Sequence, residues 1–307
     1  MQAAVVGGAG FIGSNLVDLL VNEGHDVVVI DNLSTGYRRN LNPRAPLIEI
    51  DVAVDSDRLR QALVGREVVF HTVALPRIAR SIEDPLGTHQ TNVTGTLRVL
   101  KAAVDAGVRR VVYSSSSSVY GDQPTLPLTE DMPPNPLNPY ACQKYMGELY
   151  TRNFHRTYGI ETVALRYFNV YGPRQVTEGA YCLVIGIFME QRRRGEPLTI
   201  HGDGEQTRDF TWVGDVARAN LLAGTNPGIG AGEVFNIGSG RETTVNRIAE
   251  LIGGPTVHGP ARTFDERFKR AGIERARTVL GWEPQVTIEQ GLGTLLEAAG
   301  LRHPSVV

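Results

Sequence analysis

Two side chains that together can move a proton stand close to each other in the sequence. Tyr140 and Lys144 are four residues apart in PYACQKYMGELY, a segment with a helical pattern, so they share one face of a helix. An ammonium beside a phenol favours the phenolate and lowers a pKa that is about 10 in an unperturbed tyrosine. Tyr140 is therefore a candidate general base. Many surface helices carry such a pair without any function, so the rest of the chain has to support this interpretation.

Five consecutive serines, residues 114–118, precede this segment. They stand between the apolar run VVY and the sequence VYG, and a flexible serine linker is not expected between such neighbours. The pattern instead predicts a strand over Arg110–Ser115 that delivers hydroxyl groups at its carboxyl end. Ligands of open parallel sheets bind beyond these strand ends, so the serines are expected to face a ligand crevice.

A glycine-rich segment, GGAGFIGSN, predicts where a phosphate group would bind. Gly7, Gly10 and Gly13 directly follow the first apolar run and open a helical pattern, so the backbone can approach a pyrophosphate at a helix N-terminus. Asp31 ends the second predicted strand about 20 residues downstream, where a carboxylate accepts hydrogen bonds from a ribose 2′-hydroxyl. This arrangement favours NAD over NADP. Asp51 ends the third strand and is either a contact to the adenine or a solvated strand end.

The elements that position these residues alternate between short apolar runs and amphipathic segments of helix length, which is typical of βαβ units. We expect an α/β fold with a doubly wound parallel Rossmann sheet. We assign residues 1–168 to the NAD-binding domain and residues 169–307 mainly to a smaller substrate-binding lobe, with residues 205–240 returning to the first domain. The predicted strands are Gln2–Val6, Asp26–Ile30, Leu47–Ile50, Glu67–Thr72, Arg110–Ser115 and Thr162–Tyr167, followed by Leu198–Ile200, Phe210–Val213 and Val234–Ile237.

Composition narrows the class of partner. The chain has 307 residues with 31 Lys and Arg against 33 Asp and Glu, so no net charge favours nucleic acid or an anionic membrane. Two cysteines do not make a disulfide framework, the seven histidines do not cluster with acids at metal-ligand spacing, and no apolar stretch reaches the roughly 20 residues of a membrane helix. We therefore expect a cytoplasmic protein that binds a small molecule and holds no metal.

The order of the motifs along the chain resembles the extended short-chain dehydrogenase/reductase family, and within it the nucleotide-sugar epimerases of the UDP-hexose 4-epimerase type. The segments that carry the resemblance are GGAGFIG, DNLSTG, SSSSVYG, YACQK, LRYFNVYGPRQ, GDGEQTRDFTWVGDV, FNIGSG and LGWEP. They extend over nearly the whole chain. Alignment on VYG matches the catalytic hydroxyl of the family to Ser116, the middle serine of the five.

The resemblance implies a reaction that inverts C4 of a UDP-hexose through a transient 4-keto sugar. Tyr140 would take the proton of the 4-hydroxyl while NAD accepts a hydride from C4, and Ser116 would hydrogen-bond the oxygen as charge develops. Lys144 would hold the nicotinamide ribose and lower the pKa of Tyr140. The sugar would then rotate and take the hydride back on its other face.

The resemblance also assigns binding residues. Arg208 and Arg262 would clamp the diphosphate, Asn169 would donate to it, Asp265 would hold a ribose hydroxyl, and Leu183, Thr199 and His201 would line the rest of the substrate site. NAD would contact Gly7, Gly10, Phe11, Ile12, Gly13, Asp31, Asn32, Ser34, Thr35, Gly36, Asp51, Val52, Ala74, Thr91, Tyr140, Lys144 and Phe168.

Several positions depart from the family pattern. Phe264 and Gly272 stand where a glycine and an aspartate are usual, Gln143 replaces a common serine, and Pro76 stands where some members carry a lysine. Lys269 falls near the position that limits the size of the sugar, and there it either pairs with a carboxylate or extends to solvent.

Other functions of the same family remain open at this stage: a UDP-uronic acid 4-epimerase, a 4,6-dehydratase, a decarboxylase, or a catalytically weak NAD-binding sensor. The dehydratases use an Asp-Glu pair beside the catalytic hydroxyl, where this chain has Ser117 and Ser118. Retention of Ser116, Tyr140 and Lys144 argues against a sensor. The resemblance also implies a homodimer built from the helices that start near Asn92 and Tyr140, with Asn92 as a helix-packing residue.

Overall fold

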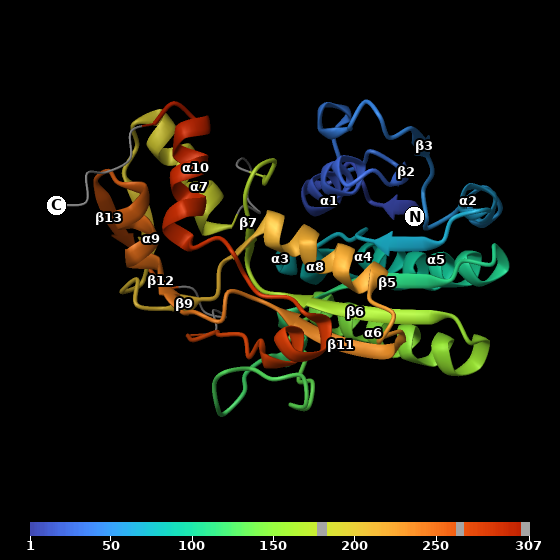
Figure 1. The fold of residues 1–307 in the computed structure, drawn as a ribbon. Helices are drawn as coiled ribbons and strands as arrows, with labels where there is room; N and C mark the ends of the chain where they lie inside the picture. The colour runs from blue at the N-terminus through green and yellow to red at the C-terminus, as the bar shows by residue number, and fades with distance from the viewer. Residues whose placement is uncertain (177–182, 262–266, 302–307) are drawn as a thin grey trace.

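A seven-stranded sheet, parallel throughout, forms the centre of the computed structural model, which describes residues 1–176, 183–261 and 267–301 (Figure 1). The strand order is β11-β6-β5-β4-β1-β2-β3, so the chain winds outward in both directions from the neighbouring strands β1 and β4. Ligands of such sheets bind where this reversal occurs. The strands are β1 (Gln2–Val6), β2 (Asp26–Asp31), β3 (Leu47–Glu49), β4 (Val68–His71), β5 (Arg110–Ser116), β6 (Glu161–Tyr167) and β11 (Ala231–Ile237).

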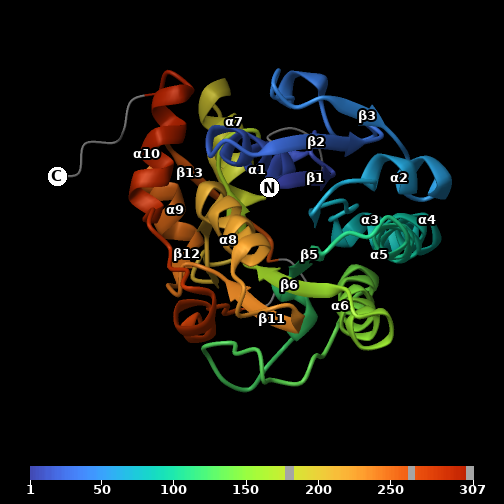
Figure 2. The ribbon, with the colours of Figure 1, turned by 45° about the vertical axis from the view of Figure 1, so that its right-hand side comes forward.

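Helices cover both faces of this sheet, which explains why its strands are apolar along their whole length (Figure 2). One face carries α1 (Phe11–Asn22) and α8 (Val213–Thr225), which pack against each other. The other face carries α2 (Ser56–Leu63), α5 (Gly95–Asp105) and α6 (Pro139–Tyr158). Two separate clusters of buried aliphatic and aromatic side chains fill the spaces between the sheet and these two layers.

Short helical pieces connect these layers near the crevice. They are η1 (Arg38–Asn40), α3 (Ile78–Glu83), α4 (Pro85–His89), the π-helical turn η2 (Gln90–Thr94) and the 3₁₀ turn η3 (Ser117–Tyr120). The η2 turn joins α4 to α5 without a break, and its Asn92 donates to Leu75 O and to the side chain of Gln143. Asn92 therefore packs η2 against α6 and the segment after β4, as the sequence predicted.

The second half of the chain builds a smaller lobe with its own apolar core. Its helices are α7 (Val184–Arg194), α9 (Val245–Ile252) and α10 (Ile288–Ala298), with the π-helical turn η4 (Ala276–Leu280) leading back from the sheet side. Three two-stranded pairs complete it: β7 (Val170–Tyr171) with β10 (Thr211–Trp212), β9 (Thr207–Arg208) with β12 (Thr243–Thr244), and β8 (Leu198–His201) with β13 (Thr256–Gly259). In Figure 1 this lobe lies to the left of the central sheet.

The strands of the central sheet agree with the sequence prediction to within a residue or two, except that β11 begins three residues earlier than expected. One prediction was wrong. The expected strand over Phe210–Val213 is only the two-residue strand β10, because α8 already begins at Val213 and continues to Thr225. Trp212 in the extended conformation is the last residue before this helix.

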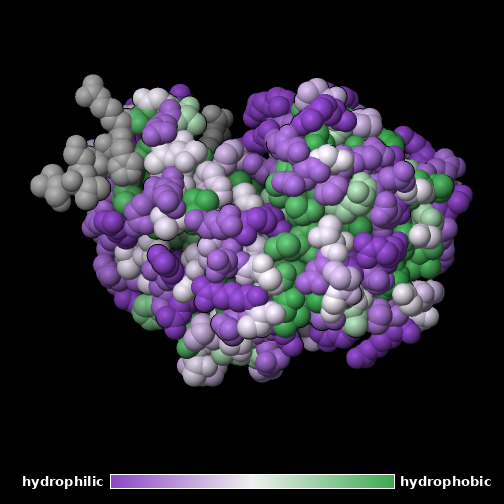
Figure 3. Space-filling view, in the orientation of Figure 1, coloured by the Kyte–Doolittle hydropathy of each residue, from purple (hydrophilic) through white to green (hydrophobic). Residues whose placement is uncertain are grey.

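Both α8 and β11 come from the second half of the chain, and both pack on the central sheet. The space-filling view shows apolar side chains gathered in a band on the face that α8 crosses, with hydrophilic residues around it (Figure 3). Within the described residues, no helix is both long enough and apolar enough to cross a membrane.

Candidate active site

The turn between β1 and α1 has the geometry that a bound pyrophosphate requires. Gly7 has φ +93°, and its N–H donates to Ile30 O, which fixes the turn against β2. A Cβ atom on Gly13 would lie only 2.1 Å from the carbonyl oxygen of Gly7, so the first turn of α1 packs directly on the loop backbone. Gly10 is the N-cap of α1 and has no side chain that could occupy the helix N-terminus. The residues present therefore fit the phosphates of a dinucleotide.

Asp31 at the end of β2 is buried beside this loop. Its Oδ2 accepts the N–H of Ala9 at 3.0 Å, and its Oδ1 accepts the N–H of Leu33 at 2.8 Å. Burial raises the pKa of Asp31, and these two backbone donors oppose that shift. Each oxygen has a second lone pair for a ribose hydroxyl, and the loop holds the carboxylate in place before any ligand binds.

The other predicted cofactor residues gather along the same edge of the sheet. Asn32 donates to the Asp51 carboxylate at 3.1 Å, which joins the ends of β2 and β3. Gly36 packs against Ala9, where a Cβ would lie 2.8 Å from the Cβ of Ala9. Phe11 and Ile12 begin α1, Ser34 and Thr35 lie in the segment after β2, Ala74 follows β4, and Thr91 lies in η2. Val52 and Phe168 are buried in the hydrophobic cores.

The serine run has a different environment at each position of β5. Ser114 Oγ lies 2.9 Å from Tyr167 Oη, and Ser115 Oγ donates to Glu148 on α6. Ser116, the last residue of β5, accepts hydrogen bonds from Ser118 Oγ at 2.9 Å and from Ser118 N at 3.2 Å. Its own hydroxyl hydrogen is thus left to donate. The run is a strand end that presents one hydroxyl to the crevice.

Tyr140 and Lys144 lie on the buried face of α6, next to the end of β5. Lys144 Nζ donates to Ser114 O at 2.7 Å and lies 6.0 Å from the centroid of the Tyr140 ring. The N–H of Tyr140 donates to Ser81 Oγ at 3.1 Å, which ties the start of α6 to α3. The Tyr140 hydroxyl also interacts with the hydroxyl of Ser116. The fold therefore brings Ser116, Tyr140 and Lys144 together at the carboxyl end of β5.

The expected lowering of the Tyr140 pKa is not found for the protein by itself. Burial is the largest effect and raises the pKa of Tyr140 to about 12, while Ser116 and the charge of Arg77 oppose it. Burial also lowers the pKa of Lys144 to about 7. Sequence reasoning assumed a solvated pair, whereas both side chains are almost fully buried, so the cost of desolvating each charged form dominates.

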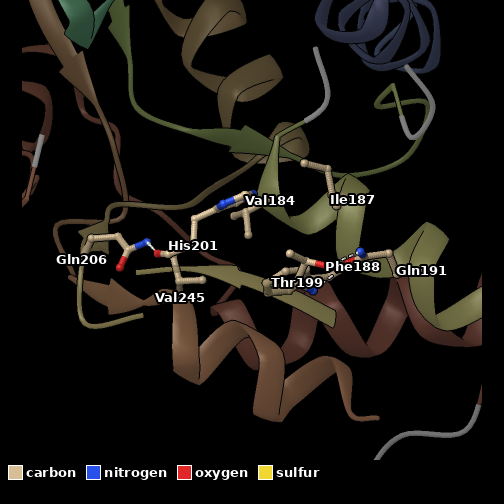
Figure 4. Close-up of a pocket in the computed structure, with 8 residues that line it drawn as sticks. All are labelled: Val184, Ile187, Phe188, Gln191, Thr199, His201, Gln206 and Val245. Atoms are coloured by element: carbon tan, nitrogen blue, oxygen red, sulfur yellow. Dashed lines mark hydrogen bonds between the residues drawn. The ribbon is translucent and has the colours of Figure 1, made fainter. Parts of the chain in front are cut away.

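A cavity of about 310 Å³ lies in the smaller lobe, between α7, β8 and the start of α9 (Figure 4). Its walls include the predicted substrate residues Thr199 and His201 on β8. The side chain of Gln191 makes two hydrogen bonds to Thr199, with its side-chain oxygen on the N–H and its amide nitrogen on the hydroxyl. The remaining lining residues, which the sequence did not identify, are Val184, Ile187, Phe188, Gln206 and Val245. This mixture of apolar walls and a few fixed polar groups suits a planar polar ring.

The other predicted substrate residues are partly accounted for. Asn169 lies between β6 and β7, and its carbonyl oxygen accepts the N–H of Thr211. Arg208 lies on β9 and donates to Thr207 O at 2.7 Å, and Leu183 is the half-exposed N-cap of α7. Arg262 and Asp265 lie outside the described residues. Lys269 is 6% exposed, so of its two predicted alternatives the extension to solvent is wrong.

Several residues near the trio were not identified from the sequence. Glu148 and Arg166 form a buried ion pair of 2.7 Å, and His71 at the end of β4 is fully buried with its pKa lowered by burial to about 3. Arg77 approaches Tyr140 closely enough for its charge to lower the pKa of Tyr140. Only Glu148 had a readable signal in the sequence, since it follows Lys144 by four residues on the same helix face.

A glycine-rich dinucleotide loop, an acidic residue after β2 and a Ser-Tyr-Lys constellation at the end of β5 define a class of nucleotide-dependent enzymes built on a doubly wound sheet. The chain belongs to the NAD dependent epimerase/dehydratase family, whose family model matches residues 3–238. It is 41% identical over 311 residues to the UDP-glucose 4-epimerase of Mycolicibacterium smegmatis, covering 97% of this chain and 98% of that protein.

Two solved structures extend this similarity to three dimensions. UDP-glucose 4-epimerase from Thermotoga maritima, solved with UDP-glucose, has a TM-score of 0.91 and 40% identity, covering 97% of this chain and 98% of that chain. UDP-N-acetylglucosamine 4-epimerase from Methanobrevibacter ruminantium, in complex with UDP-N-acetylmuramic acid, has a TM-score of 0.90 and 34% identity with the same coverage. The predicted family and fold class are confirmed.

Proposed function

We propose that the protein is a nucleotide-sugar 4-epimerase that inverts C4 of a UDP-hexose. The observation that carries this proposal is the convergence of Ser116, Tyr140 and Lys144 at the carboxyl end of β5, at the same edge of the sheet as the dinucleotide loop that follows β1. The similar proteins named above are UDP-sugar 4-epimerases by their names. The cofactor is NAD, which would lie along the loop of Gly7 to Gly13 with its adenosine ribose on Asp31.

The side chains of this site divide the proton chemistry among them. Tyr140 accepts the proton of the sugar 4-hydroxyl, and Ser116, whose hydroxyl hydrogen is free to donate, hydrogen-bonds the same oxygen. Lys144 places its charge beside the phenol and favours the phenolate. NAD, when bound, supplies the hydride acceptor and donor. Because burial raises the pKa of Tyr140 to about 12, proton removal depends on the positive charges that surround the phenol.

The cavity between α7 and β8 supports a site for the base of the nucleotide. Thr199 and His201 offer polar groups at one side, and Phe188 with Val184 forms an apolar wall (Figure 4). We propose that Arg208, on strand β9 of the same lobe, neutralises the diphosphate. We propose Asn169 and Leu183 as further contacts, and we retain Arg262 and Asp265 as candidates from the family resemblance alone.

Proton NMR tests the reaction directly. Purified protein is incubated separately with UDP-glucose, UDP-N-acetylglucosamine and UDP-glucuronic acid, and the anomeric signal of each C4 epimer is followed. We expect one epimer to form with a neutral hexose and none to form with Tyr140→Phe. Accumulation of NADH or of a deoxy-keto product without any epimer would contradict the 4-epimerase proposal and favour a dehydratase or decarboxylase.

We also propose that the protein is a homodimer paired through α5 and α6. Cys142, Met146 and Leu149 on α6 are exposed and follow the i, i+4, i+7 spacing of one helix face. This face lies opposite the one that carries Tyr140 and Lys144, so pairing would leave the crevice open. An apolar stripe of this kind is favourable only when another surface covers it.

A further inference from the structure

Glu148 is a carboxylate buried to 1% exposure in the middle of α6, and the proposed reaction gives it no role. It follows Tyr140 by eight residues and Lys144 by four, so the three side chains occupy successive turns on one helix face. All three are buried against the central sheet. A carboxylate is expensive to bury unless it is paired, so its environment has to explain it.

Arg166 on β6 is the partner of Glu148. Its Nε donates to Glu148 Oε1 at 2.9 Å and its Nη2 donates to Oε2 at 2.7 Å, a two-point contact with both side chains at 3% exposure or less. The guanidinium lies 4.6 Å from the centroid of the Tyr120 ring. Since arginine does not lose its proton in proteins, this contact pairs the Glu148 carboxylate with a permanent positive charge.

Lys144, unlike Glu148, donates its hydrogen bond to a neutral group. Its side chain is buried to 3% exposure, and its amine donates to the carbonyl of Ser114. Burial lowers the pKa of Lys144, and the charge of Glu148 raises it again. His71 on β4 and Tyr113 on β5 also face this amine. His71 has its pKa lowered to about 3 and Tyr113 has its pKa raised, so both are neutral near pH 7.

Two contacts also connect this part of α6 to the end of β5. Lys144 holds the carbonyl of Ser114, and Glu148 accepts the hydroxyl of Ser115. Ser116 is the next residue of the strand. The charged groups of α6 are therefore fixed relative to the strand that carries the third member of the trio.

We propose that Glu148, held in place by its two-point contact with Arg166, is a positioning residue that keeps Lys144 in its ammonium form inside the buried site. This inference rests on the proposed roles of Tyr140 and Lys144. If the ammonium is needed for turnover, activity is lost as the pH rises through the point where Lys144 gives up its proton. Removing the charge of Glu148 should therefore move this loss to lower pH.

The test is the pH profile of kcat for the conversion of UDP-galactose to UDP-glucose in Glu148→Gln and in Glu148→Asp. The alkaline half-point is the pH at which kcat has fallen to half of its maximum on the alkaline side of the profile. It should be lower by roughly one to two pH units in Glu148→Gln, the size expected for losing a charge one helical turn away. Glu148→Asp keeps the charge and should restore most of the wild-type profile. Tyr167→Phe is the matched control, since it removes a buried hydroxyl that bonds Ser114 and Asn220 and should leave the half-point unchanged.

Loss of one partner from a buried ion pair can prevent folding. If Glu148→Gln does not fold, Glu148→Gln/Arg166→Gln leaves no unpaired charge, and a smaller downward movement is expected because the positive charge of Arg166 is removed together with the carboxylate. A folded neutral variant with the wild-type alkaline half-point would overturn the inference. Wild-type turnover in Tyr140→Phe or Lys144→Met would instead overturn the proposed roles on which it rests.

Discussion

Ser114, Ser115 and Ser116 are consecutive residues with the same side chain, yet their hydroxyl groups have different hydrogen-bond partners. The Ser114 hydroxyl meets Tyr167, the Ser115 hydroxyl meets Glu148, and Ser116 is left at the strand end with a hydrogen to donate. The alternation of side chains along a strand explains this difference between neighbours. The role of a serine in this run is therefore fixed by its position in β5 and not by its type.

Tyr140→Phe should reduce kcat by roughly 10²- to 10⁴-fold, the usual contribution of a general base. The phenyl ring fills the same space, so NAD content should be unchanged. Turnover measured by proton NMR, with NAD content measured by absorbance after denaturation, checks both statements. Tyr158→Phe at the exposed end of the same helix should behave like the wild type. Turnover of Tyr140→Phe close to that of Tyr158→Phe would contradict the assignment of the base.

Lys144→Met should stabilise the protein near pH 7 while abolishing turnover. The pKa of Lys144 is about 7 in the folded chain and 10.5 as its ordinary value, so between these pH values the folded state binds fewer protons than the unfolded state. The contribution of Lys144 to the free energy of unfolding therefore rises as the pH increases between these two values, and it is least favourable below the lower one. At pH 7 we expect Lys144→Met to raise the free energy of unfolding by roughly 1–4 kcal/mol.

Urea unfolding at several pH values between 6 and about 10 measures this effect, because the difference between wild type and Lys144→Met isolates the one group. The difference should shrink as the pH rises. A difference that is zero or independent of pH would show that the amine is not desolvated in the folded protein.

Among the elements, the turn between β1 and α1 depends most on glycine, because its backbone segments pack too closely for a Cβ atom. Gly13→Ala would place a Cβ 2.1 Å from Gly7 O, a contact that forces the turn and α1 apart. We expect purified Gly13→Ala to lose most of its NAD and to be destabilised by more than about 2 kcal/mol. Cofactor content and thermal unfolding are the measurements.

Gly107→Ala is the control for this substitution. Gly107 has φ +73° after α5, but a Cβ there would meet nothing within 4 Å. Gly107→Ala should lower the free energy of unfolding by only about 1 kcal/mol, because of backbone strain, and the purified variant should keep its cofactor. Equal loss of NAD from both variants would mean that general destabilisation, and not the turn, releases the cofactor.

Much at the element scale was predictable from the sequence, because strands such as Val68–His71 and Arg110–Ser116 are covered on both faces and read as continuous apolar runs. The glycine turn and the Tyr140–Lys144 pair could be singled out for a similar reason, since their spacing is local, whereas Ser116 was chosen among the five serines through the family resemblance. The two-residue strand Thr211–Trp212 was not predicted correctly, because its pairing with Val170–Tyr171 depends on contacts distant in sequence.

Other parts of the site could not be predicted from local sequence patterns either. Gln191 and Gln206 line one cavity only after α7 and β8 pack together. The pKa of Tyr140 was predicted with the wrong sign, since burial depends on the whole fold. The assignment of residues 1–168 and 169–307 to two functional parts stays a prediction.

At the scale of the whole molecule, the exposed stripe on α6 predicts how two copies associate. Met146→Asp/Leu149→Asp would place two carboxylates in the proposed helix pairing, where they cannot be solvated, so the protein should become monomeric. Sedimentation velocity measures the mass. Val279→Asp is a control with similar exposure on η4 and should keep the wild-type mass. An unchanged mass for the double variant would contradict pairing through this face.

The pairing of β11 with β6 has a consequence for how the chain is made. Seven residues of β6 are synthesised long before Ala231–Ile237, and until β11 arrives β6 is the open edge of the sheet. An open parallel edge is a site for misassociation between nascent chains. A fragment that stops after residue 168 would keep this edge exposed permanently. This fragment is therefore expected to aggregate when produced alone, although it holds every residue of the proposed catalytic trio.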